Sequence, residues 1–152
     1  MKLSTKGRYG LRAIIDLARY SENEPVSINS IAARQKISEG YLEQIVSLLK
    51  KGGLVKSIRG AFGGYVLAKD AKDISVGDVL RALEGSLEPV KCGAFHPEEA
   101  CSAADGCVTK YVWQKINESI TQTVDGICLE ELVQESRRIN PDGGYTSQTC
   151  KN

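Results

Sequence analysis

The sequence predicts a mainly α-helical fold with one small β-hairpin, in the order of a winged helix-turn-helix, with one long helix added behind it. Three observations predict this fold. Three amphipathic segments with capping residues follow one another within the first 53 residues. Two short β-prone runs then flank a glycine-rich turn. Farther along the chain, apolar residues recur at every fourth position over a long stretch.

The first three helices are predicted from their caps and from the spacing of their apolar residues. Residues 5–20 form the first helix, which Ser4 or Thr5 caps. Ser27 is a good cap for a short second helix. Ser38 caps the third, and a pair of glycines ends it. Together they give the three-helix part of a helix-turn-helix domain.

A β-hairpin and a fourth helix are expected next. The runs 54–59 and 65–68 favour strands, and the glycines between them favour a tight turn. Ser75 with Asp78 has the pattern of a capping box, which opens a helix to about Leu83. From Gly85 onward the pattern dissolves into glycine, proline and cysteine, so a loop is expected there.

One long helix is predicted from apolar residues at every fourth position. They are Val108, Val112, Ile116, Ile120 and Val124. No other helix is at hand to cover this stripe, so we expect a dimerisation helix that pairs with a second copy of itself. A short helix over 129–133 follows. The expected units are a winged helix-turn-helix domain (1–84), a cysteine-bearing loop (85–107), the dimerisation and short C-terminal helices (108–136) and a disordered tail (137–152).

Charge is distributed unevenly along the 152 residues, although the net charge is only +1. Residues 1–70 hold 12 Lys and Arg against 6 Asp and Glu, whereas residues 71–152 hold 8 against 13. This split predicts a basic surface that meets a polyanion and an acidic half that regulates or oligomerises, unless the asymmetry is chance.

The composition also bears on the compartment. No apolar run approaches the ~18 residues that span a bilayer, and the first residues lack the apolar core of a signal peptide. Five cysteines fit a reducing environment better than a disulfide scaffold. We therefore expect a cytoplasmic protein with no membrane partner.

The third predicted helix is the candidate reader of double-stranded DNA. In a helix-turn-helix this helix enters the major groove with its N-terminal end first. Gln44 can pair with adenine, and Glu43 can accept from cytosine while it rejects wrong sites. A solvated helix face that touches nothing is the alternative. The candidate DNA contacts on this helix are Ser38, Gly40, Tyr41, Glu43 and Gln44.

The hairpin turn is the second candidate contact with DNA. Arg59 suits a wing lying along a minor groove, whose negative potential attracts arginine. Gly60, Gly63 and Gly64 permit a positive φ and a close approach to phosphate. An ordinary glycine-rich hairpin is the alternative. The GXXG loop of a KH domain is discounted because that loop joins two helices.

Several separated motifs resemble the Rrf2 family of bacterial winged-helix repressors, which includes IscR-, NsrR- and CymR-type members. The motifs are residues 4–9, 38–44, 53–60 and 63–65, and the resemblance runs from Met1 to about Val133. It implies a homodimer on a palindromic operator. It also implies that Ser38, Gly40, Tyr41, Glu43, Gln44 and Arg59 contact DNA.

Cys92, Cys101 and Cys107 form the candidate metal site. Thiolates in a loop hold zinc or an iron–sulfur cluster. The spacing fits no ferredoxin pattern. It matches three ligands of a Cys3His zinc finger, but the position expected for histidine is Tyr111. The resemblance implies an iron–sulfur cluster, first of all 2Fe–2S, with 4Fe–4S as the alternative.

The fourth ligand is open. The resemblance implies a histidine where this chain has Lys110, or an aspartate from the partner subunit near the place of Arg8. His96, the only histidine, is the first candidate, although a lone loop histidine is more often solvated. The further candidates are Cys128, Glu98, Glu99 and Asp105, whereas Cys150 lies in the predicted tail.

Taken together, the sequence predicts a transcriptional repressor that senses iron–sulfur cluster or redox status and controls genes of cluster assembly or sulfur metabolism. The alternative is a metal-free, CymR-like regulator of cysteine metabolism that acts through thiols or an enzyme partner. A thiol enzyme, with Cys92 or Cys107 as nucleophile and His96 as base, is disfavoured. Catalytic pairs come from separate rigid elements, and these residues share one loop.

Overall fold

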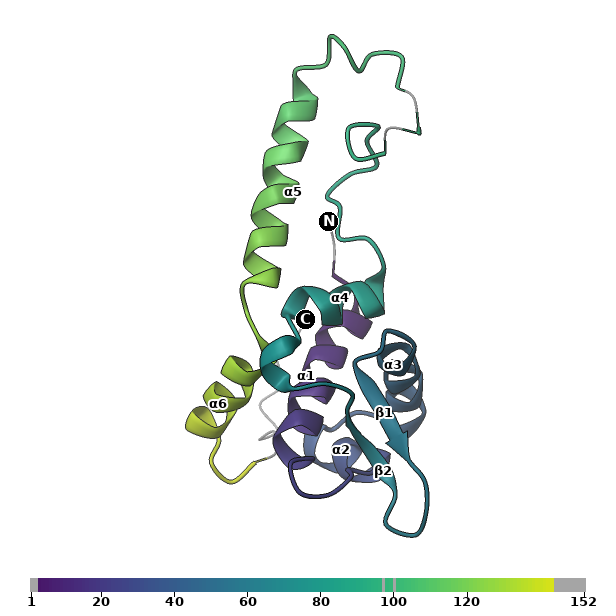
Figure 1. The fold of residues 1–152 in the computed structure, drawn as a ribbon, viewed down its shortest axis with the longest axis vertical. Coiled ribbons are helices and arrows are strands. Elements are labelled where there is room, and N and C mark those ends of the chain that lie inside the picture. The colour runs from purple at the N-terminus through teal and green to yellow at the C-terminus, as the bar shows by residue number, and fades with distance from the viewer. Residues whose placement is uncertain (1–2, 97, 100, 144–152) are drawn as a thin grey trace.

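Six α-helices, one short 3-10 helix and a two-stranded antiparallel hairpin make up the described part of the chain (Figure 1). The structure is a computed structural model that describes residues 3–96, 98–99 and 101–143. The three helices followed by a hairpin have the winged helix-turn-helix order that the sequence predicts. The elements are α1 (Thr5–Tyr20), α2 (Ile28–Gln35), α3 (Glu39–Lys51), β1 (Val55–Ile58), β2 (Gly64–Leu67), η1 (Ala71–Asp73), α4 (Val76–Glu84), α5 (Thr109–Asp125) and α6 (Leu129–Ile139).

Serine caps define where four of the helices begin. The Ser4 hydroxyl accepts the backbone N–H of Lys6 at 3.2 Å at the start of α1. Ser27 and Ser38 cap α2 and α3 in the same way. At α4, Ser75 and Asp78 form the full reciprocal capping box that the sequence predicts.

The core lies between α1 and the helices packed around it. Ile14 and Leu17 of α1 are fully buried against Ile31, Leu42 and Ile45 of α2 and α3. The hairpin joins this core through Val26, whose backbone exchanges hydrogen bonds of 2.9 and 2.8 Å with that of Tyr65. The wing is therefore attached to the turn that precedes the helix-turn-helix.

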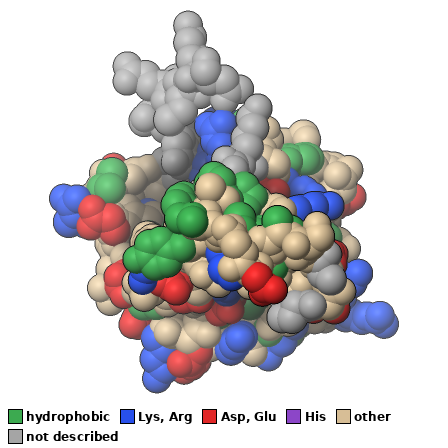
Figure 2. Space-filling model, turned by 90° about the horizontal axis from the view of Figure 1, so that it is seen from above, with side chains coloured by type: hydrophobic (Ala, Val, Ile, Leu, Met, Phe, Trp, Pro, Cys, Tyr) green, Lys and Arg blue, Asp and Glu red, His purple; other side chains and the backbone are tan. Residues whose placement is uncertain are grey.

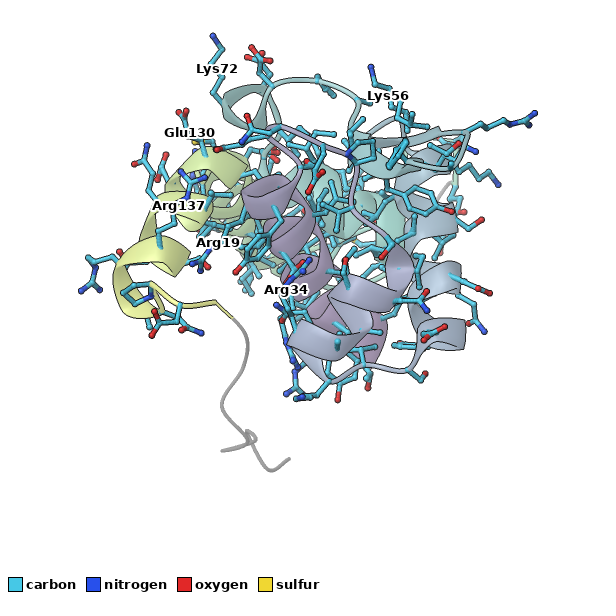
Figure 3. All side chains as sticks on the ribbon, turned by 90° about the horizontal axis from the view of Figure 1, so that it is seen from below. Arg19, Arg34, Lys56, Lys72, Glu130 and Arg137 are labelled. Atoms are coloured by element: carbon cyan, nitrogen blue, oxygen red, sulfur yellow. The ribbon has the colours of Figure 1, made fainter. Side chains whose placement is uncertain are left out.

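The C-terminal helix is longer than the sequence predicted. Residues 137–139, which we expected to begin a disordered tail, continue α6 to Ile139. Arg19, which lies between α1 and α6 in Figure 3, donates to the carbonyl oxygens of Ser136 and Asn140. Arg137 pairs with Glu22 at 2.6 Å. These contacts with α1 and with the turn after it hold the end of α6, while residues 144–152 of the expected tail lie outside the described residues.

Helix α5 projects from the rest of the molecule, and the described loop residues 85–96, 98–99 and 101–108 lie at the same end (Figure 1). None of its residues is buried. The turn of the hairpin lies at the opposite end of the molecule. In Figure 2, viewed from the α5 end, hydrophobic side chains gather on the visible face. No helix in the described ranges is long and apolar enough to cross a membrane.

Candidate DNA-reading surface and cysteine loop

The predicted recognition residues in the first turns of α3 differ in how far their side chains are exposed. Glu43 and Gln44 are exposed, and Gly40 has open space around it. Ser38 is exposed, but its hydroxyl also accepts the backbone N–H of Tyr41 at 3.4 Å. The Tyr41 ring is half-buried and meets the ring of Tyr9 edge-on, with the centroids 6.0 Å apart. Only part of the Tyr41 side chain is therefore open to a partner.

A buried ion pair fixes the helix-turn-helix on α1. The Asp16 carboxylate accepts two hydrogen bonds from the Arg34 Nε at 3.1 and 2.9 Å and one from Gln35 at 2.8 Å. Arg34 also stacks on the Tyr20 ring, 4.1 Å from its centroid, where α2 meets α1 (Figure 3). The hydrogen bond to Asp16 raises the pKa of Arg34. This network was not predicted from the sequence, although Asp16, a carboxylate among the apolar residues of the first helix, indicated that a buried partner was needed.

The wing glycines have different structural roles. Gly60 has a φ of 118° and nothing close to its missing side chain. A Cβ on Gly63 would overlap the carbonyl oxygen of Ile58, and one on Gly64 would lie 2.7 Å from that of Val26. The backbone N–H of Gly63 donates to the Gly60 carbonyl at 3.0 Å and closes the turn. This turn joins two strands, whereas the GXXG loop of a KH domain joins two helices. Arg59 is exposed beside this turn.

The cysteine loop has suitable donors, but the structure does not gather them. Cys92 and Cys107 are half-exposed, Cys101 is exposed, and every cysteine among the described residues is a free thiol. Cys101 packs against Gly93, where a Cβ would lie 3.2 Å from its own. Within the described ranges, no group of three or more His, Cys, Asp or Glu is placed to hold a metal ion. The donor chemistry fits an iron–sulfur cluster, and the loop must close to use it.

Cys107 is the cysteine best prepared to act as a thiolate. Its Sγ lies 3.1 Å from the Thr109 hydroxyl, at the beginning of α5. The hydrogen bond with Thr109, followed by that from the backbone of Lys110, lowers the pKa of the thiol. A thiolate is the form that binds metals and reacts with oxidants.

The candidate fourth ligands are occupied by other contacts. The two ring nitrogens of His96 lie 2.9 Å from Glu88 and 3.3 Å from Glu98. The hydrogen bond with Glu88 is the main cause of the raised pKa of His96. The His96 ring would have to leave both carboxylates to become a ligand. The Cys128 thiol, at the cap of α6, lies 3.3 Å from Glu131.

A carboxylate connects the loop to the first helix. Glu84, the last residue of α4, accepts hydrogen bonds from the Ser4 hydroxyl at 2.6 Å and from the backbone N–H groups of Ser4 and Gly7. Desolvation raises the pKa of Glu84, but the hydrogen bonds from Ser4 and Gly7, with the charge of Lys6, outweigh it and leave the pKa lowered. Sequence reasoning missed this contact, since 80 residues separate its partners.

Comparison with known proteins gives one consistent match in sequence. Residues 3–135 match the Rrf2 family model, described as an iron-dependent transcriptional regulator. The HTH-type transcriptional regulator IscR of Pectobacterium atrosepticum is 41% identical over 140 residues, which cover 92% of this chain and 84% of that protein. IscR of Serratia proteamaculans is 43% identical over 133 residues, covering 88% of this chain and 79% of that protein.

Two kinds of solved structure are similar to the fold. IscR of T. potens has a TM-score of 0.72 and 44% identity, over 95% of each chain. CymR, the global cysteine regulator of B. subtilis, has a TM-score of 0.73 and 42% identity, over 89% of this chain and 98% of that one. Similarity of fold alone therefore does not separate an IscR-like from a CymR-like function.

Proposed function

Because this chain belongs to the Rrf2 family of transcriptional regulators, we propose that it is a homodimeric repressor whose cysteine loop holds an iron–sulfur cluster. The chain is a DNA-binding regulator of transcription, and it is not an enzyme. The finer proposal is that cluster status controls its operator affinity in the cytoplasm. Its target genes would then be those of cluster assembly or sulfur metabolism.

The exposed ends of α3 and of the hairpin support the DNA-reading part of the proposal. Glu43 and Gln44 lie exposed near the N-terminal end of α3, where a recognition helix meets base edges. Arg59 is exposed beside the hairpin turn. The proposed DNA contacts are Ser38, Gly40, Tyr41, Glu43, Gln44, Arg59, Gly60, Gly63 and Gly64.

The apolar face of α5 supports the homodimer. Val108 is 82% exposed, Tyr111 62% and Val112 45%, on a helix without a single buried residue. An apolar stripe on a projecting helix is stabilised when a second helix covers it. A dimer also places two recognition helices on one duplex, as a palindromic operator requires.

Three free, partly exposed thiols in one loop carry the proposal for the cluster. Cys92, Cys101 and Cys107 supply the ligands, of which Cys107 has the thiolate form favoured by its hydrogen bonds. A bound iron–sulfur cluster would supply a site that gains or loses electrons, or is lost altogether, as iron and oxidants change. His96, or one of the carboxylates beside it, remains the candidate for the fourth ligand.

A route from the loop to the DNA-reading domain runs through Glu84. The loop begins at Gly85, directly after the carboxylate that holds the first turn of α1. Closing the loop around the three thiols moves the end of α4 and, through Glu84, the beginning of α1. Cluster loading can then shift the population of operator-binding conformations by as much as it favours one of them.

The experiment is to purify the protein without oxygen, record its visible spectrum and measure iron, sulfide and zinc. Matched iron and sulfide in a brown sample support the cluster. Cys101→Ala should then lose the iron and still fold. Ser102→Ala is the matched control, since this exposed residue lies beside Cys101 in the same loop, is not a candidate ligand and should leave the iron content unchanged. Equal iron in wild type and Cys101→Ala would refute the ligand set.

A metal-free, CymR-like regulator is the second candidate function. The similarity to CymR favours it. It would sense its signal through Cys107 or through an enzyme that binds it. A colourless sample that takes up no cluster from iron and sulfide would select this function, whereas stoichiometric zinc would make the loop a structural site.

A further inference from the structure

An exposed aromatic ring stands at the tip of the wing. Phe62 is 93% exposed, a larger fraction than for any other exposed large hydrophobic side chain in the described part of the chain. Turn positions favour glycine, asparagine, aspartate and serine, which tolerate both water and the backbone geometry. Phenylalanine there adds nothing to the core, so the fold gives no reason for its presence.

The turn presents this ring rigidly and without bulk on either side. The hydrogen bond from the Gly63 N–H to the Gly60 carbonyl, 3.0 Å long, leaves Ala61 and Phe62 as the two central residues. Glycines flank this pair on both sides, so no other large side chain shields the ring. The tip is therefore narrow, with one apolar group at its end.

Charge around the ring indicates what it meets. Residues 54–69, which span the hairpin, contain Lys56, Arg59 and Lys69 and no acidic residue. An apolar tip on a hairpin whose only charged residues are cations, with Arg59 beside the turn, favours a polyanion with apolar surface inside it, which describes the minor groove of DNA. The dimer face does not cover the ring, because α5 projects from the opposite end of the molecule (Figure 1).

We propose that Phe62 is an apolar wedge, which enters the minor groove beside Arg59 and partly unstacks a base step. The inference rests on the proposed contact between the wing and DNA. Arg59 would then be held by the negative potential of the groove, while Phe62 contacts base edges and sugars. Aliphatic and aromatic wedges of this kind bend the duplex towards the major groove.

The wedge gives the wing a preference for particular DNA sequences, in addition to the attraction of its cations for phosphate. Pyrimidine–purine steps such as TA and CA are the easiest to unstack and kink. The operator should therefore carry such a step where the wing reaches the minor groove. Stiff A-tract sequence at that place should weaken binding without the loss of any base contact from α3.

The experiment uses full-length dimer and a duplex that wild-type protein selects from a random-sequence library. Phe62→Ala should lower affinity about tenfold or more, because it removes a buried apolar contact. Phe62→Leu should restore part of it, since leucine also acts as a wedge. Ala61→Ser is the matched control at the neighbouring exposed position and should change little. All three should fold like the wild type, because both side chains lie outside the core.

Two further readouts separate a wedge from a phosphate contact. Phe62→Ala should leave the salt dependence of binding unchanged, whereas Arg59→Ala should lower its slope by about one. With 2-aminopurine at the wing-contacted step, the wild type should raise the fluorescence on binding and Phe62→Ala should not. If Arg59→Ala weakens binding but Phe62→Ala changes neither affinity nor fluorescence, the wedge is wrong and the wing contact stands. If neither variant weakens binding, the wing itself does not touch DNA.

Discussion

At the scale of single residues, Asp16 is a carboxylate inside the core, with 3% of its surface exposed. Its partners Arg34 and Gln35 are both on α2, so the network sets where the helix-turn-helix lies on α1. Asp16→Ala would leave the partly buried guanidinium of Arg34, whose side chain is 25% exposed, without its counter-charge. We expect the free energy of unfolding to fall by about 3 kcal/mol, measured by urea denaturation at a fixed protein concentration.

An exposed ion pair provides the control for Asp16. Lys115 and Glu118 lie 3.3 Å apart on the surface of α5, where solvent screens the attraction. Glu118→Ala should change the free energy of unfolding by less than about 0.5 kcal/mol. Similar losses in the two variants would show that burial of Asp16 has no special part in stability.

At the scale of elements, α1 and α4 pack against each other through glycines. A Cβ on Gly10 would overlap Cδ1 of Leu83 and lie 3.2 Å from its Cγ, and Leu83 is itself buried. Gly10→Ala should therefore separate the helices and lower the free energy of unfolding by about 1–3 kcal/mol. Gly40→Ala, in open space at the exposed first turn of α3, should instead raise it by up to about 1 kcal/mol through helix propensity. If Gly10→Ala and Gly40→Ala both raised the thermal stability, the close packing of Gly10 against Leu83 would be contradicted.

The Glu84 contact predicts a pH-dependent part of the stability. Since its pKa is lower in the folded chain than the usual 4.5, folding is favoured above that value. The contribution is lost as the pH falls through the lowered pKa of the folded state. Wild type should be more stable than Glu84→Gln at neutral pH, and the difference should vanish in acid. Urea midpoints of the two proteins across the acid range measure this, and a constant difference would argue against an ionised Glu84.

The elements also show which parts of the fold the sequence can predict. Ser4, Ser27, Ser38 and Ser75 cap helices through contacts with residues at most three positions away, so local reading finds them. The end of α6 depends on contacts of Arg19 and Arg137 with residues more than 100 positions away. No local pattern contains such partners, and for that reason the helix was expected to stop too early.

The same distinction applies to the candidate site. Residue type and order were enough to propose three thiols, a recognition helix and a wing. The hydrogen bonds that hold Glu84 join residues about 80 positions apart, so no local pattern contains them. The ion pairs of His96 with Glu88 and Glu98 are local in sequence, but they depend on how the loop folds, which its irregular sequence does not predict. Phe62 was visible in the sequence, but only its exposure at the tip distinguishes it from a core residue.

At the scale of the whole molecule, the proposed dimer rests on the exposed apolar face of α5. Val112→Asp would place a carboxylate in a helix interface, next to its own symmetry copy. We expect the dimer to dissociate at least about 100-fold more readily, because burying unpaired like charges costs several kcal/mol. Sedimentation equilibrium measures this, with Lys115→Ala on the same helix as control. Operator affinity should fall with dimerisation, and a fully dimeric Val112→Asp protein would point to another interface.

If the hairpin of residues 54–69 is the proposed DNA-binding wing, its three cations and lack of acidic residues also affect how the protein finds its operator. Cationic contacts with phosphate are alike on every sequence, so they allow the protein to slide and hop along DNA before it is bound. The time that the protein needs to reach a vacant operator then depends on the salt concentration as well as on the operator sequence. After sudden dilution of salt, repression would resume sooner, even where the final occupancy is the same.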